Sequence, residues 1–565
     1  MKMHKILSLV LVLCLMLSCL AVASAEEEDE LMAKWNSETQ YILDNYSAFF
    51  EEDGLGDVMQ PYEETVTLSL AKFYTAADET RVATFNERYG ETFESNRWTY
   101  ITENALNITF DYEWWALNGD DYNQKLRLEM AAGNLPDVFT ATQSDVLQLA
   151  EAGLIIDVSD LIEQYASTDL KEILSSDGGM GYDMVSYDGG VYGIPKRASD
   201  TDAYSYLFIR KDWMEALNLE WPSTIDDLEN IMKAFSEADF DGNGEDDTVG
   251  MAVNKSLWYL VRGLCSAYGA YPEYWVEDEE GNVVFGATQP EMKDALSTLR
   301  HFFEEGYIDP EFATQTETVA LEAVLNGKCG VVYGGHWLGH TFGDLHELDP
   351  DSEWVCMTLP TGNGEAVSSP LTPNVSKWYC ISVDCENPEA ALKVLNLWEY
   401  AFFNANDAAW FSYEENDSRN NVAPLNGSVA ATDNMDVYKM LQQMLETNDS
   451  SVLKGKAIAY WGNFLNESLA WEWNLMFGAG DTPMKVLCEA YESGLTFYNA
   501  FVGPQNELMQ ERWSTIQDEF LTMSTKIILG EISVEEGFDQ WLNTFSALGG
   551  DEITAYVNEW KDSLD

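Results

Sequence analysis

The sequence predicts an α/β protein of two lobes, each a mostly parallel sheet flanked by helices, followed by a helical C-terminal region. Three observations support this fold class. The chain has 565 residues, more than one ordinary hydrophobic core accommodates. Strands and amphipathic helices alternate along its first part, and the alternation restarts near residue 206. After about residue 386 the pattern is mainly helical.

The N-terminus has the composition of an export signal. Lys2 and Lys5 precede an apolar run at residues 6–22, and Ala23-Ser24-Ala25 supplies a small-x-small cleavage site. Cys19 offers a second interpretation, a lipidated exported lipoprotein, although Leu17 makes that motif imperfect. No later segment has ~20 consecutive apolar residues. We therefore expect an exported protein that is soluble or tethered by one lipid.

The elements of the first lobe follow the signal. Residues 26–62 are acidic and aromatic, and we expect a helical leader on the outside of the protein. Alternating apolar residues predict strands at 66–73, 106–112 and 135–139. A helix is predicted at 122–132, with Leu126, Met130 and Ala131 at helical spacing and Gly133 as its stop. This order is typical of a sheet with helices on both faces.

The second lobe begins with a strand at 206–209 and a helix at 224–238, which starts at a capping box of Thr224 and Asp227. Thr288 and Glu291 predict a second capping box. The helix after it has an apolar face made of Met292, Ala295, Leu296, Leu299, Phe302 and Phe303. Further strands are predicted at 329–333, 354–359 and, as a return strand, 378–383.

These elements predict a division of the chain. The signal peptide takes residues 1–25 and the leader residues 26–62. The first lobe takes 63–200 and about 366–408, and the second lobe with the helical region takes 201–365 and about 409–565. The chain must then cross between the lobes more than once.

The charge excludes several partners. The formal net charge is −68, from 98 acidic against 30 basic residues. Such a chain is repelled by nucleic acid and by anionic membranes. A polyanionic ligand is disfavoured too, unless its site is locally basic. Hydrophobic residues at 46% and aromatic residues at 13% exclude general disorder.

One cluster of oxygen-bearing residues has the spacing of a calcium loop. Asp239, Asp241, Asn243, Glu245 and Asp247 stand at every second position, with Gly242 and Gly244 between them. Alternate side chains then point into one small volume while the glycines let the backbone turn, which is how Ca²⁺ collects oxygen ligands. The simpler alternative is an acidic, solvated turn.

Histidines and cysteines do not predict a second metal site. His336 and His340 are four residues apart, but a zinc site needs a third ligand, and Trp337 stands where a hydrolytic H-E-x-x-H motif has glutamate. Six cysteines follow the signal, which permits disulfides in an exported chain. Their spacing matches no zinc motif, and buried free thiols are the simpler interpretation: Cys265, Cys329, Cys356, Cys380, Cys385 and Cys488.

Four stretches, in order along the chain, carry a resemblance to a known family. They are residues 122–162, with G-N-L-P-D followed by G-L-I; residues 191–195 (VYGIP) with 209–213 (IRKDW) and the calcium loop; residues 304–312 (EEGYIDPEF) leading into 327–330 (GKCG); and residues 387–391 (NPEAA) with the tail at 527–560. The chain resembles the extracellular solute-binding proteins, family 1, of bacterial ABC transporters, in the branch that includes oligosaccharide and alginate binders.

The resemblance implies a type II periplasmic-binding-protein-like fold, in which two lobes close about a hinge over a solute. It implies a non-enzymatic monomer with no catalytic residues that captures an oligosaccharide and delivers it to ABC permease subunits. Its location would be extracellular or at the cell surface, or periplasmic in a Gram-negative source. Bound Ca²⁺ would be structural, although Thr248 replaces an acid that relatives commonly carry after the fifth ligand.

Candidate ligand-binding residues follow from loops at strand ends, where α/β sheets bind ligands. Aromatic rings pack against sugar C–H groups, and carboxylates and amides bind hydroxyls. Trp337 is the strongest candidate because Gly334-Gly335 implies an open loop beside a strand end; for any other single tryptophan, core packing is the simpler interpretation. The candidates are Tyr74, Thr75, Asp78, Thr140, Thr142 and Gln143 in the first lobe, and Trp258, Tyr259, His336, Trp337, Trp410 and Trp461 across the cleft.

Two other classes stay open. A cell-surface glycan-binding module would use the same cleft without a transporter, and a neighbouring pair of permease genes would argue against it. A glycan-acting hydrolase would need a placed carboxylate pair, and among 98 acids some pair has that separation by chance. The sequence contains no G-x-S-x-G elbow, P-loop or kinase motif set.

Overall fold

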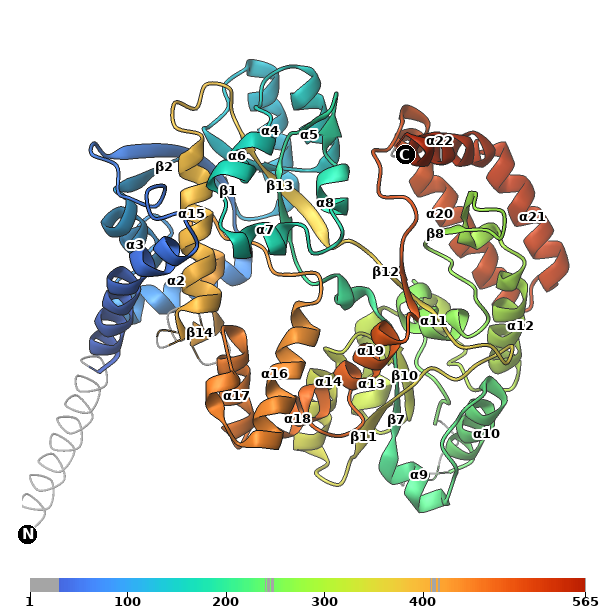
Figure 1. Ribbon diagram of the computed structural model, residues 1–565. Coiled ribbons are helices and arrows are strands. Elements are labelled where there is room, and N and C mark those ends of the chain that lie inside the picture. The colour runs from blue at the N-terminus through green and yellow to red at the C-terminus, as the bar shows by residue number, and fades with distance from the viewer. Residues whose placement is uncertain are drawn as a thin grey trace, which may run out of the picture.

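The computed structural model describes residues 30–563 except 239, 241–243, 245–247, 407, 409–412 and 415–416. Its ribbon forms two lobes that meet near the middle of the molecule (Figure 1). The first lobe is built on a five-stranded sheet and the second on a three-stranded sheet. The predicted signal peptide and Cys19 lie outside the described residues. No helix within the described part of the chain is long and apolar enough to cross a membrane.

The first sheet brings several strand ends to one edge. Its strand order is β2 (Ile108–Ala116), β1 (Val66–Phe73), β3 (Val138–Ala141), β13 (Val375–Ile381) and β6 (Ile194–Arg197). β1 is parallel to β2 and β3, whereas β13 is antiparallel to β3 and β6. The carboxyl ends of β1, β2, β3 and β6 therefore share one edge with the amino end of β13.

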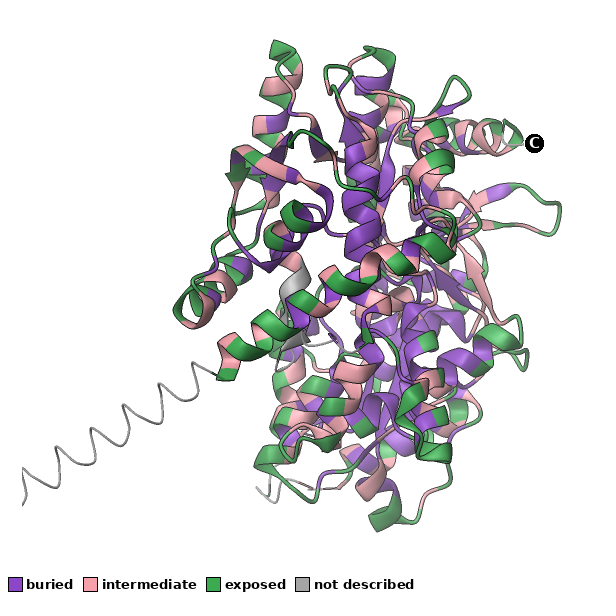
Figure 2. Ribbon diagram, turned by 60° about the vertical axis from the view of Figure 1, so that its left-hand side comes forward, coloured by how far each residue is buried: buried purple, intermediate pink, exposed green. Residues whose placement is uncertain are grey.

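Helices cover both faces of this sheet because residues along each strand alternate between two cores. Leu70 and Tyr379 belong to one core, and Phe139 and Trp378 to the other. A helix at residues 30–52, the expected leader, is exposed along much of its length (Figure 2). The other helices are α2 (Ala76–Tyr89), α3 (Arg97–Leu106), α4 (Gly119–Ala132), α5 (Gln143–Glu151), α6 (Ser159–Tyr165), α7 (Thr168–Leu174), α8 (Met180–Asp183) and α15 (Glu389–Glu399), which continues into the π-turn η4 (Tyr400–Asn404).

The second sheet has the order β10 (Val331–Gly334), β7 (Tyr206–Arg210) and β11 (Trp354–Met357). Both pairs are antiparallel, so the expectation of parallel pairing is wrong for this sheet. Parallel contact in this lobe includes the single bridges Val249↔Cys329 and Met251↔Ile308. The helices that flank the sheet are α9 (Lys211–Leu217), α10 (Ile225–Ser236), α11 (Trp258–Ser266), α12 (Glu291–Glu304), α13 (Glu317–Leu325) and α14 (Leu338–Leu348).

The helical C-terminal region divides between the two faces of the second sheet (Figure 1). Tyr206 and Phe208 of β7 share a core with α16 (Asp433–Thr447), α17 (Lys456–Leu465), α18 (Ala470–Phe477) and α19 (Pro483–Glu492). Leu207 and Ile209 share the opposite core with α20 (Glu507–Ile528), α21 (Val534–Ala547) and α22 (Gly550–Asp562). The small strands are β4 (Ser186–Tyr187), β5 (Gly190–Val191), β8 (Trp275–Glu277), β9 (Val283–Phe285), β12 (Ser369–Leu371), β14 (Tyr413–Glu414), β15 (Asp417–Ser418) and β16 (Thr496–Tyr498).

One of the two predicted capping boxes forms. The amide of Asp227 donates to Thr224 Oγ1 at 3.1 Å, and the amide of Thr224 donates to Asp227 Oδ2 at 3.0 Å. The box predicted at Thr288 is wrong. Its hydroxyl donates instead to the carbonyl of Phe285 at 2.7 Å within a 3₁₀ turn, and Pro290 stands at the N-cap of α12. Proline suits a helix start because its missing N–H would have no partner there.

The division of the chain into lobes stays a prediction at its exact residues, but core contacts bear on one boundary. Val422, Ala423 and Leu425 pack in the core of the first lobe, whereas Met435 packs in that of the second. These contacts favour a crossing near residue 430 rather than near 408. The six cysteines after the signal are unpaired, and Cys385 is the one among them that is not fully buried.

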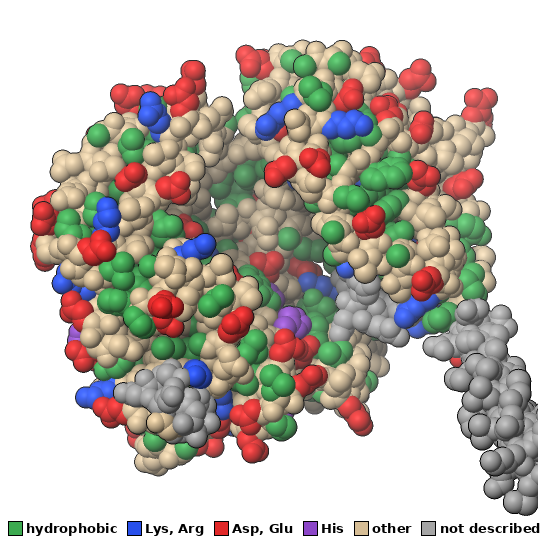
Figure 3. Space-filling view, turned by 180° about the vertical axis from the view of Figure 1, so that it is seen from behind, with side chains coloured by type: hydrophobic (Ala, Val, Ile, Leu, Met, Phe, Trp, Pro, Cys, Tyr) green, Lys and Arg blue, Asp and Glu red, His purple; other side chains and the backbone are tan. Residues whose placement is uncertain are grey.

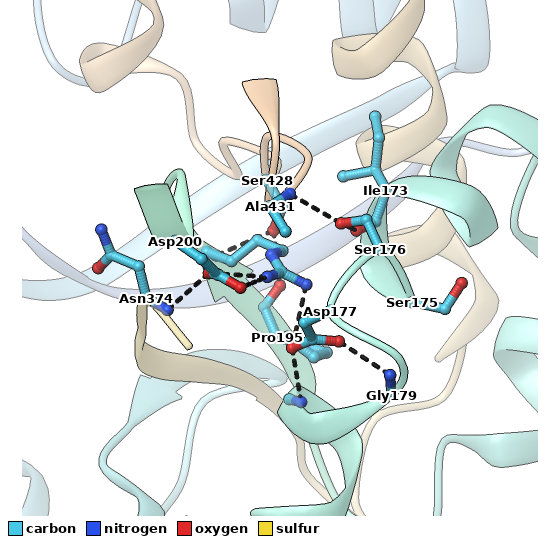
Figure 4. Close-up of polar contacts among 12 residues, drawn as sticks. Ile173, Ser175, Ser176, Asp177, Gly179, Pro195, Asp200, Asn374, Ser428 and Ala431 are labelled. Atoms are coloured by element: carbon cyan, nitrogen blue, oxygen red, sulfur yellow. Dashed lines mark hydrogen bonds and ion pairs between the residues drawn. The ribbon is translucent and has the colours of Figure 1, made fainter. Parts of the chain in front are cut away.

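The hinge consists of three segments that run between the lobes: residues 198–205, 372–374 and the stretch before α16. Seen from behind, the two lobes are separated by a deep hollow (Figure 3). The buried guanidinium of Arg197 lies 3.1 Å from Asp177 Oδ2 and 2.9 Å from Asp200 Oδ2, so it ties the first of these hinge segments to the loop before α8. Asp177 and Asp200 sit among Asn374, Ser428 and Ala431 (Figure 4).

Asp200 connects all three crossing segments. Its carboxylate accepts hydrogen bonds from the amide of Asn374 at 2.7 Å and from the hydroxyl of Tyr498 at 3.0 Å, and its own amide donates to the carbonyl of Ala431 at 3.0 Å. The amide of Arg197 also donates to Ser428 Oγ at 3.1 Å. Hydrogen bonds of Asp200 and Arg197 therefore connect the three crossing segments.

Replacing Arg197 tests how much its ion pairs with Asp177 and Asp200 contribute. Arg197→Ala leaves two buried carboxylates without their cation, and we expect the free energy of unfolding in urea to fall by about 3–5 kcal/mol. The control is Lys485→Ala, which removes an exposed i,i+4 pair with Asp481 and should change stability by less than ~0.5 kcal/mol. Equal effects of the two substitutions would contradict a central role for Arg197.

Candidate functional site

Each sheet has one edge close to the connection between the lobes, and these two edges face each other across the hollow. β6 ends at Arg197 and β7 begins at Tyr206, so only a short connection separates the two edges. β10 is antiparallel to β7, and its last residue, Gly334, pairs with Tyr206. The loop after Gly334 therefore lies at the edge that faces the strand ends of the first lobe. Acidic, basic and histidine side chains line the hollow (Figure 3).

The wall contributed by the second lobe is aromatic. Trp337 follows β10 and is 39% exposed. Its ring lies parallel to that of Tyr259, with centroids 6.0 Å apart and planes 6° apart. The Tyr259 hydroxyl accepts a hydrogen bond from the amide of Gly335 at 3.1 Å. A Cβ on Gly335 would come within 2.4 Å of the Trp337 ring, so glycine is needed for this approach.

His336 lies beside this aromatic pair, with its ring centroid 5.4 Å from that of Trp337. Burial lowers its pKa to about 3, and Lys456 and His340 add to the effect by repelling the charged form. The imidazole is therefore neutral at physiological pH. Its buried Nδ1 has no hydrogen-bond partner among the described residues.

The wall contributed by the first lobe is basic. Lys72 lies near the end of β1, Lys196 near the end of β6, and Lys377 near the start of β13. In the sheet register Lys196 pairs with Lys377, and Lys72 pairs with Trp115. Trp115 is 40% exposed, whereas its neighbour Trp114 is buried, because adjacent residues of a strand point to opposite faces of the sheet. The edge thus combines ammonium groups with an exposed aromatic ring.

The side chains of the other candidate residues in the first lobe already contact neighbouring residues of that lobe. Tyr74 is fully buried with its ring stacked on Phe93 at 3.9 Å, which contradicts its expected place on the cleft surface. Asp78 is buried too, and accepts from the amide and hydroxyl of its N-cap, Thr75, each at 2.8 Å. Both side chains therefore support the edge of the sheet from within.

Thr140, Thr142 and Gln143 have structural partners as well. The Thr140 amide donates to the hydroxyl of Tyr122 at 3.1 Å. Thr142 caps α5. The Gln143 side chain donates to the carbonyl of Met184 at 2.8 Å and to that of Val502 at 3.0 Å, so it links the first lobe to the segment before α20. Ligand contact by these residues stays a prediction.

The remaining aromatic candidates separate by burial. Trp258 is only 8% exposed and stacks on Phe520 at 5.0 Å inside the second core, so the prediction of a cleft residue is wrong there. Trp461 is partly exposed and stacks on Phe464 at 5.7 Å. Trp410 lies outside the described residues.

Two open pockets also lie between the lobes, and none of the predicted ligand-binding residues lines either. One, of about 400 Å³, lies between α7 and α16 and is lined by Asp169, Ser176, Asp433 and Lys456 among others. The other, of about 720 Å³, has an aromatic lining that includes Tyr271, Phe497, Tyr498 and Trp560.

The five predicted calcium ligands, Asp239, Asp241, Asn243, Glu245 and Asp247, lie outside the described residues. Among the residues that are described, no group of three or more His, Cys, Asp or Glu side chains could hold a metal ion. Gly244 is described, and its φ of +76° puts it in the left-handed region that a sharp loop turn requires.

The lysines at the first edge were missed by the sequence reasoning. Lys72 lies inside a predicted strand and Lys196 directly follows the V-Y-G-I-P stretch. The available signal was a lysine within an apolar strand of a chain that has only 30 basic residues. Their pairing could not have been found, since it depends on the order of the strands.

Comparison with known proteins agrees with this architecture. The polygalacturonan/rhamnogalacturonan-binding protein YtcQ of Bacillus subtilis (strain 168) is 30% identical over 235 residues, 41% of this chain and 45% of YtcQ. The lipoprotein LipO of the same strain is 24% identical over 455 residues, 78% of this chain and 84% of LipO. The chain therefore aligns with less than half of YtcQ but with most of LipO.

Solved structures share the fold. The alginate-binding protein AlgQ2, determined without calcium ion, has a TM-score of 0.57 at 17% identity, covering 89% of this chain and 99% of AlgQ2. An EF-hand mutant of the Streptococcus pneumoniae ABC-transporter substrate-binding protein FusA, in complex with fructo-nystose, has a TM-score of 0.55 at 18% identity, covering 88% and 99%. The family described as bacterial extracellular solute-binding protein matches residues 76–399. The chain belongs to this family.

Proposed function

We propose that this protein is the extracytoplasmic binding component of an ABC importer and captures an oligosaccharide in the cleft between its lobes. The main support for this proposal is the parallel pair of Trp337 and Tyr259 rings. The Trp337 side chain is 39% exposed, and the pair lies at a sheet edge that faces the strand ends of the other lobe. Flat aromatic surfaces of this kind pack against sugar rings. The relatives' names point the same way, since YtcQ binds polygalacturonan or rhamnogalacturonan.

Capture requires contacts to both lobes. A ligand shifts the protein toward a closed form only by the difference in its affinity for the two forms. Trp337 and Tyr259 belong to one lobe, and Trp115 and Lys196 to the other. A saccharide that spans the hollow would touch both walls and favour closure about the hinge. The closed form would then be presented to the permease by a monomeric, exported protein, processed after Ala25 or lipidated at Cys19.

We propose no catalytic role. The buried carboxylates at the first edge, Asp78 and Asp145, are held by helix caps and by arginine. Purified protein incubated with oligosaccharides should therefore release no reducing sugar. Such release would favour a glycan-acting hydrolase, whereas tight binding in a cell without a matching permease would favour a surface glycan-binding module.

Trp337→Ala tests the binding surface directly. Removing the exposed ring should weaken oligosaccharide binding about tenfold or more. One ring stacked on a sugar contributes about 1.4 kcal/mol to the binding free energy, and that amount corresponds to a tenfold change in Kd. The matched control is Trp221→Ala, because Trp221 is 41% exposed but lies at a different pocket, beside Lys211 and Trp471. Isothermal titration calorimetry and ligand-induced shifts in Tm measure both variants.

Two outcomes would count against this proposal. If neutral and charged oligosaccharides all fail to bind or to raise the Tm of the wild-type protein, oligosaccharide capture is wrong. If Trp221→Ala weakens binding as much as Trp337→Ala does, the aromatic wall near the hinge is not the binding surface.

We further propose that the loop of Asp239, Asp241, Asn243, Glu245 and Asp247 binds a structural Ca²⁺. The residues around the loop support this. Phe240 stacks on Trp213 at 4.2 Å, and the amide of Val249 donates to the carbonyl of Lys328 at 2.8 Å. An ion held between these anchors would tie the end of α10 to the start of β10. The FusA structure of an EF-hand mutant indicates such a motif in a relative.

Chelation tests the calcium proposal. A chelator should lower the Tm of the wild-type protein, because it removes a ligand that binds only the folded state. Asp241→Ala should have a lower Tm that the chelator does not change further. Glu279→Ala removes an exposed acid far from the loop in sequence and should respond as the wild type does. A chelator response that persists in Asp241→Ala would contradict this site.

A further inference from the structure

Two lysines stand directly opposite each other at the cleft edge of the first lobe. Lys196 of β6 and Lys377 of β13 are partners in the antiparallel register. Like charges at such positions destabilise a sheet. Lys72 of β1 adds a third basic side chain; burial lowers the pKa of Lys72 well below its ordinary value, and the charge of Lys196 adds to that shift. A chain with 98 acidic and 30 basic residues thus gathers three lysines at one edge.

Two carboxylates whose charges act on these lysines are already bound. Asp78, whose charge raises the pKa of Lys196, accepts from Thr75 Oγ1 at 2.8 Å and lies 2.5 Å from Arg81 Nη1. Asp145, whose charge raises the pKa of Lys377, accepts from Thr142 Oγ1 at 2.7 Å and lies 3.2 Å from Arg127 Nε. Each carboxylate therefore has its own capping hydroxyl and its own arginine.

Lys196 differs from the other two lysines in having no polar partner. The Lys72 ammonium donates to the carbonyl of Pro424 at 3.0 Å, and that of Lys377 donates to Asn123 Oδ1 at 2.5 Å. Within the described residues, no carbonyl, carboxylate or amide oxygen accepts a hydrogen bond from the Lys196 ammonium, which lies 6.0 Å from the centre of the Tyr379 ring. Its three donors are free to bind a ligand that enters the hollow.

The helices that follow the strands reinforce this positive edge. α2 begins directly after β1 and α5 directly after β3, so both N-termini lie at the same edge. The partial positive charge of a helix N-terminus favours anions. Ala76 and Ala77 in the first turn of α2 are exposed, which leaves that end open to the cleft.

We infer that the saccharide bound in this cleft is anionic, and that Lys196 binds a carboxylate or sulfate oxygen of it between Lys72 and Lys377. This inference rests on the proposed oligosaccharide capture and names the class of saccharide. A neutral hydroxyl could accept a hydrogen bond from Lys196, but it would bring no negative charge to the three lysines. A bound anion brings that charge and forms a charge-assisted hydrogen bond with the Lys196 ammonium. The locally basic site also overcomes the general repulsion of anions by a chain of charge −68.

The experiment compares anionic with neutral saccharides. Isothermal titration calorimetry with the full mature protein uses trigalacturonate, its neutral methyl ester, and the sulfate ester of an otherwise neutral trisaccharide. The wild type should bind trigalacturonate or the sulfated trisaccharide about tenfold or more tightly than the neutral ester. Preference for trigalacturonate alone identifies a carboxylate ligand, and preference for the sulfated probe alone identifies a sulfate ester.

Substitutions at Lys196 assign the contact. Lys196→Met keeps much of the side-chain volume and should weaken binding of the anionic probe about tenfold while changing binding of the neutral ester less than about twofold. Lys196→Arg keeps the charge and should keep the preference for anions. Lys485→Met makes the same change of net charge at an exposed lysine of α19 and should behave as the wild type does.

The pH dependence gives an independent readout. Burial lowers the pKa of Lys196 to about 8, with Asp78 opposing that shift and Lys377 adding to it. As pH rises through 8 the free protein loses the ammonium, so affinity for the anionic probe should fall by up to about tenfold per pH unit. Lys196→Arg stays charged and should hold its affinity to pH 9.5.

The outcomes separate this inference from the proposed function. If the neutral ester binds the wild type as tightly as the anionic probes do, or if Lys196→Met weakens both kinds equally, the inference is wrong while oligosaccharide capture stands. If no saccharide binds the wild type, the proposed function fails and the inference fails with it. Circular dichroism and the Tm without ligand confirm that each variant is folded.

Discussion

The ion triad of Arg197, Asp177 and Asp200 is the interaction on which the two-lobed structure depends. It lies where the chain passes between the lobes, and the carboxylate and amide of Asp200 reach the other two crossing segments. Removing one member of a group of buried, paired charges leaves another charge buried without its partner, which is strongly destabilising. The triad therefore fixes which backbone groups meet at the hinge, and with them the direction in which each sheet presents its edge.

The chemistry of the cleft follows from that orientation. The first sheet turns its carboxyl ends toward the hollow, and with them Lys72, Lys196 and Lys377. The second sheet turns the end of β10 toward the same space, where Gly335 allows the Trp337 ring to fold back beside Tyr259. One wall thus offers positive charge and the other a flat apolar surface. A sugar that carries an acid group fits both walls, because its ring can pack on the aromatic side chains and its acid group can pair with the lysines.

Local signals in the sequence predicted local structure well. The capping box of Thr224 and Asp227 forms because each partner is three residues from the other and nothing nearby competes. The Thr288 box fails because α12 begins only at Glu291, with Pro290 at the N-cap, so Glu291 is not the third helical residue that the box requires. Tyr74 and Trp258 were expected in the cleft and are buried, since the side on which a ring packs depends on neighbours far away in the chain.

By itself the sequence determined the family, the α/β alternation, the restart at residue 206 and the aromatic loop after Gly334-Gly335, because each rests on residues adjacent in the chain. Only the tertiary structure decided that Lys196 stands opposite Lys377, that the second sheet is antiparallel, and that Asp78 and Asp145 are already bound. These facts depend on strand order and on contacts between segments far apart in the chain, such as Gln143 with Val502, which are 359 residues apart. Spacing along the chain carries no record of them, since many strand orders fit the same pattern.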